Sequence, residues 1–98
     1  MSWVGVVELD VVFDARSLKE KRSVVRPVVA ALKRYDVAAA EVGHLDLHAR
    51  ALVAASVVAA DLAHVREVLD RCERAVADRP ELELLSARTR VFGPDDEE

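Results

Sequence analysis

The feature that most constrains this chain is the order in which two hydrophobic periodicities follow one another. Alternation with a period of two is typical of a β-strand, and apolar residues spaced three and four apart are typical of a helix buried on one side. Strand-like and helix-like segments occur in the order strand, helix, strand, strand, helix, strand, at residues 3–13, 18–32, 37–42, 47–58, 62–76 and 81–92. The pattern therefore predicts a β-α-β-β-α-β domain.

Local signals mark where the two helices begin. Ser17 followed by Glu20 forms a capping box, in which each side chain satisfies a free backbone N–H of the first turn, so a helix is expected from about Leu18. Asp61 is expected to cap the second helix with its side chain. Pro27 lies inside the first helix and lacks the N–H for an intrahelical bond. We expect a bend or a shifted hydrogen bond there, and not the end of the helix.

The strands predict one antiparallel sheet. Residues 43–46 read as a hairpin connection, so the second and third strands should pair antiparallel. In the last strand, adjacent Leu84 and Leu85 break the alternation, which predicts a β-bulge. With right-handed crossovers, this order puts two helices on one face of a four-stranded antiparallel sheet, the α+β fold called ferredoxin-like. One domain is expected over residues 1–92, followed by an acidic tail at residues 93–98 that we expect to be disordered.

Length and composition agree with a single domain. A chain of 98 residues with 52% hydrophobic content is large enough for one core and too small for two. No basic leader precedes an apolar stretch, and no apolar run approaches the roughly 20 residues that span a bilayer. We therefore expect a cytoplasmic protein with no membrane partner. The single cysteine, Cys72, excludes an internal disulfide and is expected to be buried.

The charge is polarised along the chain. The formal net charge of −4 equals the contribution of the acidic residues 95–98, whereas residues 16–34 hold seven bases and one acid. In the first helix the bases form a stripe, extended by two more near its start. Phosphate groups are natural partners for such a stripe, and a solvated helix face remains the alternative interpretation. The predicted nucleic-acid-binding residues are Arg16, Lys19, Lys21, Arg22, Arg26 and Lys33.

Three segments carry a resemblance to a known family. They are SLKEKRSV at residues 17–24, AEVGH with DL at residues 40–44 and 46–47, and ELL at residues 83–85. Together they resemble the small bacterial YlxP-like family, a domain of unknown function, over nearly all of residues 3–92. The resemblance implies a ferredoxin-like fold and a genomic setting beside transcription-elongation, translation-initiation and ribosome-maturation factors. It implies no established reaction.

The face of the sheet away from the helices offers a second interpretation. It is expected to carry many aliphatic side chains and no aromatic residue of the two central strands, which argues against base stacking on the sheet. Exposed aliphatic surface of this kind is typical of a protein interface. The simplest partner is a second copy of the chain, which would form a homodimer. The predicted dimer face contains Val6, Leu52 and Val58.

Polar residues around the hairpin are the remaining candidates. Glu41, His44, Asp46 and Arg50 are expected to form a polar cluster, either a recognition site or a structural brace. His44, Asp46 and His48 alternate at ligand-like spacing, but a turn through residue 43 destroys that geometry, so we expect no metal.

No catalytic apparatus is recognisable in the sequence. Acylphosphatases of this size and fold cradle phosphate in a glycine-rich loop after the first strand. Here residues 14–17 contain no glycine, which also argues against a small-molecule regulatory domain. The sequence predicts a non-enzymatic accessory protein without cofactor that binds RNA or a ribosome-linked protein through the first helix. The alternative is a homo-oligomeric interaction module without a nucleic-acid role.

Overall fold

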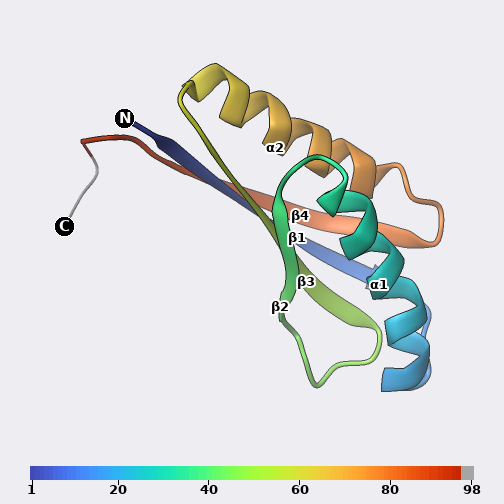
Figure 1. Cartoon of the computed structure of the whole chain (residues 1–98). Coiled ribbons are helices and arrows are strands. Elements are labelled where there is room, and N and C mark those ends of the chain that lie inside the picture. The colour runs from blue at the N-terminus through green and yellow to red at the C-terminus, as the bar shows by residue number, and fades with distance from the viewer. Residues whose placement is uncertain (96–98) are drawn as a thin grey trace.

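The computed structural model describes residues 1–95 and has the predicted order of elements (Figure 1). The strands pair antiparallel in the order β2-β3-β1-β4. This arrangement, with two helices against the sheet, is the ferredoxin-like α+β fold that the sequence predicts. The elements are β1 (Trp3–Phe13), α1 (Leu18–Lys33), β2 (Ala38–Gly43), β3 (Arg50–Ala59), α2 (Leu62–Ala77) and β4 (Leu82–Phe92).

The core lies between the sheet and the two helices. α1 packs on β2 and β3, and α2 packs on β1, β3 and β4. Odd-numbered residues of β1 and β3 face the helices, and all of them except Trp3 and Ala59 are buried. Because strand side chains point alternately to the two faces, the even-numbered residues form the open face. The most deeply buried side chains include Val7, Leu9, Val11, Val53, Val28, Leu32, Val65 and Cys72.

The helix starts follow the predicted capping signals, with one difference. Ser17 Oγ accepts a hydrogen bond from the Glu20 backbone N–H at 3.1 Å, and Asp61 caps α2 by accepting from the Ala63 N–H at 2.9 Å. The Glu20 carboxylate, however, accepts from the N–H of Arg16 at 3.0 Å, one residue before the cap. α1 continues through Pro27 to Lys33, so the proline does not end the helix.

The predicted bulge in β4 is present. Asp10 of β1 pairs with Ser86, and the next residue, Val11, pairs with Leu84. Leu85 is therefore the extra residue, as the break in alternation indicates.

The connection between β2 and β3 is longer than predicted. The sequence places the start of the third strand at residue 47, whereas β3 begins at Arg50 and residues 44–49 form a loop. The reason lies in the hydrogen bonds of this loop. The carbonyls of His44 and Leu47 accept from the ammonium group of Lys21, at 2.8 and 2.7 Å. Bound by α1 in this way, they are not part of the sheet ladder.

Two further features bear on the sequence predictions. The predicted acidic tail at residues 93–98 extends beyond the described residues, because residues 96–98 lie outside them. Within residues 1–95, neither helix is long and apolar enough to cross a membrane.

Candidate functional site

The exposed side of α1 carries a stripe of unpaired bases. Lys19, Arg22, Arg26 and Lys33 are all exposed, and at 100° per residue they fall within a sector roughly 60° wide. We call these four residues the basic stripe. None of their side chains forms an ion pair or hydrogen bond within residues 1–95, and the same holds for the exposed side chain of Arg16, just before the helix.

Many other bases of the described chain are paired with acids. Those pairs neutralise positive charge on α2, β3, β4 and the connection between α2 and β4, whereas the basic stripe keeps its charge for a partner. The pairs are Arg50 with Asp10, Arg71 with Glu67, Arg74 with Asp70, Arg79 with Glu81 and Arg90 with Glu8.

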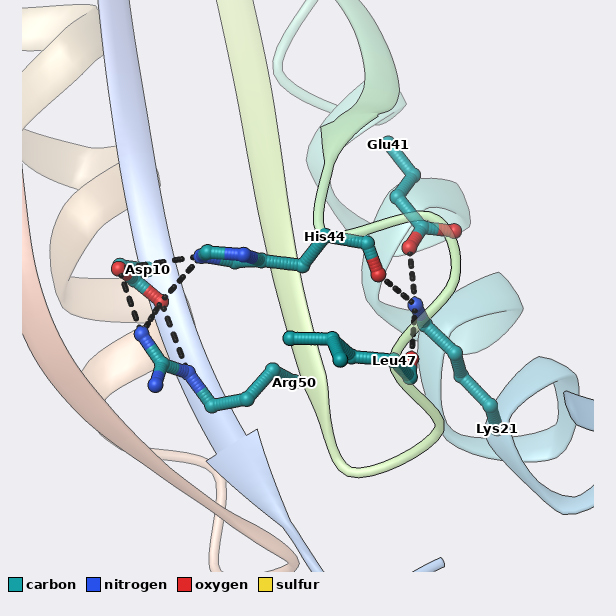
Figure 2. Close-up of polar contacts among 6 residues, drawn as sticks. All are labelled: Asp10, Lys21, Glu41, His44, Leu47 and Arg50. Carbon is teal, nitrogen blue, oxygen red and sulfur yellow. Dashed lines mark hydrogen bonds and ion pairs between the residues drawn. The ribbon is translucent and has the colours of Figure 1, made fainter. Parts of the chain in front are cut away.

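Lys21 does not belong with the predicted nucleic-acid-binding residues. It is 3% exposed, and its ammonium group lies 2.6 Å from Glu41 Oε2 while donating to the two loop carbonyls of His44 and Leu47 (Figure 2). The ammonium group thus faces one carboxylate and two carbonyls of the same domain. The prediction that Lys21 contacts nucleic acid is therefore wrong. Its role is to hold the β2–β3 loop against α1.

The predicted polar cluster separates into two groups. Glu41 pairs with Lys21, on the helix side of the sheet. The His44 ring and Arg50 instead meet at Asp10, on the open face (Figure 2). Asp46 is exposed, and no ion pair or hydrogen bond of its side chain occurs in the described part of the chain.

Asp10 is the residue that the sequence prediction of this cluster missed. Arg50 donates to both carboxylate oxygens of Asp10, at 2.8 and 2.9 Å, and His44 Nε2 lies 3.4 Å from each. Burial by itself raises the pKa of Asp10, but the hydrogen bonds and charges of Arg50 and His44 outweigh it and lower the pKa below its ordinary value. The sequence did contain a signal for Asp10. It is an even-numbered residue of β1, and these residues lie on the open face together with Arg50.

A groove of about 530 Å³ runs beside α1, between the basic stripe and the core. Arg22, Arg26 and Lys33 line it together with an apolar surface and with the carboxylate-bearing Glu41. The apolar side chains come from the helix and from the β2–β3 loop, and they are Leu18, Val25, Val29, Ala30 and Leu45. The groove thus places aliphatic surface directly beside positive charge.

The predicted dimer face is apolar mainly at one end of the open sheet face. Val58 is 66% exposed, whereas Val6 and Leu52 are partly buried. Val4 pairs with Val58 on one side and Phe92 on the other, so three exposed apolar side chains form a row across β3, β1 and β4. The predicted dimer face did not include Phe92, because the register of β4 decides its position.

The histidines of the hairpin point to different partners. The His44 ring approaches Asp10, while His48 Nδ1 lies 2.5 Å from the carbonyl oxygen of Ala15, before α1. Across residues 1–95, no group of three or more His, Cys, Asp or Glu side chains is arranged to hold a metal ion.

Most of the length of this chain matches known proteins. The sequence model of a family described as "Protein of unknown function (DUF503)" matches residues 4–89. "Uncharacterized protein YlxP" of Bacillus subtilis (strain 168) is 28% identical over 91 residues, covering 91% of this chain and 99% of that protein. The two findings confirm the family resemblance stated from the sequence.

Proposed function

The chain belongs to the DUF503 family, and from its basic stripe we propose that it is a non-enzymatic, cytoplasmic accessory protein that binds RNA through α1. The observation that carries the proposal is that Lys19, Arg22, Arg26 and Lys33 are exposed, aligned and unpaired within residues 1–95. Side chains of this kind hold phosphate groups without reading the base sequence. The implied genomic setting beside translation and ribosome-maturation factors points to ribosome-associated RNA.

The stripe has dimensions that suit a polymer of phosphates. From Lys19 to Lys33 it extends about 21 Å at 1.5 Å per residue, and Arg16 lies just before its N-terminal end. A single small anion occupies one or two such side chains, whereas a nucleic-acid strand presents a phosphate to each of them. Binding of this type releases counterions and weakens steeply as salt increases.

Fluorescence anisotropy with a labelled RNA oligonucleotide tests the proposal. The wild type should bind at low salt, and the variant K19E/R22E/R26E should lose binding while retaining its far-UV circular dichroism. Arg66→Glu and Arg88→Glu are matched controls, because both arginines are exposed and unpaired in the described chain but lie off the stripe. Absence of wild-type binding at low salt, or an equal loss in the controls, contradicts RNA binding by α1.

A second candidate function rests on the open sheet face. The exposed row of Val4, Val58 and Phe92 is the kind of surface that a second copy of the chain can cover. We propose a homodimer through this face as the alternative interaction module. Sedimentation of the wild type should then give a dimer mass, and Val58→Asp should give a monomer of unchanged secondary structure. A wild-type monomer at high concentration contradicts this alternative.

A further inference from the structure

The basic stripe by itself does not distinguish single-stranded from double-stranded RNA, because both present phosphates. The groove beside α1 adds a surface of different chemistry. Building on the proposed function, we infer that the groove holds one unpaired nucleoside of an RNA strand whose phosphates lie on the basic stripe. The protein is then a single-strand-selective binder.

The apolar part of the groove is the first argument. Leu18 of α1 is 47% exposed and Leu45 of the β2–β3 loop is 60% exposed, and both line the groove beside the buried Val25. Exposed aliphatic side chains next to positive charge match a ligand with an apolar face and an anionic group. A nucleotide of a single strand has both, because its base face is free and its phosphate is anionic. In a duplex the base faces are covered by stacked neighbours.

The carboxylate of Glu41 is the second argument. Its Oε2 is held by Lys21, which neutralises a charge that repels phosphate. Oε1 has no partner among residues 1–95 and remains able to accept a hydrogen bond (Figure 2). The Watson–Crick edge of every base carries an N–H donor, which is available only when the base is unpaired.

Size and position are the third argument. The groove volume of about 530 Å³ lies within the range of about 300–1,000 Å³ that small-molecule sites occupy. Arg22, Arg26 and Lys33 line the groove, whereas Lys19 and Arg16 do not. The charge thus continues past the groove along α1. An RNA strand uses both parts, while an acidic peptide seated in the groove leaves the outer bases without a partner.

The test compares a 5′-labelled single-stranded RNA with the same strand annealed to its complement, over a series of salt concentrations. L18A/L45A removes apolar groove surface and leaves every charge in place. Leu85→Ala is the matched control, since Leu85 is 46% exposed on β4 and far from α1 in sequence. K19E/R22E/R26E removes cations that bind phosphate and should reduce the salt slope by about one for each phosphate that is no longer bound.

We expect the wild type to bind the single strand about tenfold tighter than the duplex. L18A/L45A should bind the single strand about fivefold more weakly with an unchanged salt slope, because only apolar surface is removed, and L85A should behave as the wild type. Equal affinity for both RNAs, or wild-type binding by L18A/L45A, overturns the inference while leaving RNA binding by the stripe intact.

Failure of the proposed function gives a different result. In that case the wild type binds neither RNA at low salt, and the inference falls with it. A labelled helical peptide of alternating leucine and glutamate blocks then shows whether a protein occupies the groove. Peptide binding that is abolished in L18A/L45A assigns the groove to an acidic protein partner.

Discussion

Lys21 Nζ lies 2.6 Å from Glu41 Oε2. This ion pair joins the first turn of α1 to the edge strand β2. The same ammonium group holds two carbonyls of the β2–β3 loop. A single buried base therefore fixes the position of the loop that carries Leu45, one wall of the groove. The bases of the stripe, at neighbouring sequence positions, remain free for a partner within the described chain.

Replacement of Lys21 by methionine should destabilise the domain. The change keeps an apolar stem but removes the cation paired with Glu41 and the donor of two carbonyls, and we expect the free energy of unfolding to fall by about 3 kcal/mol. Urea denaturation measures this change. Lys19→Met is the matched control, because Lys19 is exposed and unpaired in the described chain, and it should change stability by less than about 0.5 kcal/mol. Equal stability of the two variants contradicts the bracing role of Lys21.

The pair of Asp10 and Arg50 should make stability depend on pH in the acid range. Because the pKa of Asp10 is lower in the folded protein than in the unfolded chain, the carboxylate stabilises the fold above about pH 4. This contribution is lost as the pH falls through the folded pKa. Melting temperatures of the wild type and Asp10→Asn should differ at pH 7 and converge toward about pH 2. Parallel curves over that range show that Asp10 contributes no such linkage.

Gly5 should tolerate no side chain while α2 keeps its present packing. A Cβ at this position of β1 lies 2.5 Å from a methyl carbon of Val65 and 2.6 Å from one of Leu69, both on α2. Gly5→Ala should therefore cost about 1–3 kcal/mol through overpacking. The double variant Gly5→Ala with Leu69→Ala should lose less stability than the sum of the two single changes. Strict additivity argues against a steric conflict between these residues.

Replacement of Pro27 should stabilise the domain. It lies in the helix interior and cannot donate to the carbonyl of Ser23. Pro27→Ala restores a donor and a good helix former, so we expect the free energy of unfolding to increase by about 1 kcal/mol or more. Thermal and urea denaturation report the change. A less stable variant indicates that the surrounding packing is adapted to the proline.

The sequence by itself determined the order of elements, the helix starts, the β4 bulge and the exposed bases of α1. Each of these follows from local backbone geometry: the period of two in strands, 3.6 residues per turn in helices, and capping groups within four residues. Helical spacing also carried a signal for Lys21 that the prediction did not use. Lys21 precedes the buried Val25, Val28 and Leu32 by four, seven and eleven residues, which places it on the core face.

Only the tertiary structure decided which charges pair between different elements and what lies beside the basic stripe. Asp10 meets Arg50 across 40 positions of sequence, and Lys21 meets Leu47 across 26. The loop that supplies Leu45 lies beside α1 because Lys21 binds the carbonyls of His44 and Leu47. Contacts of this kind depend on how distant segments are brought together, and local periodicity contains no information about a partner that lies on another element. The basic stripe was therefore readable from the sequence, while the groove and the brace of Lys21 were not.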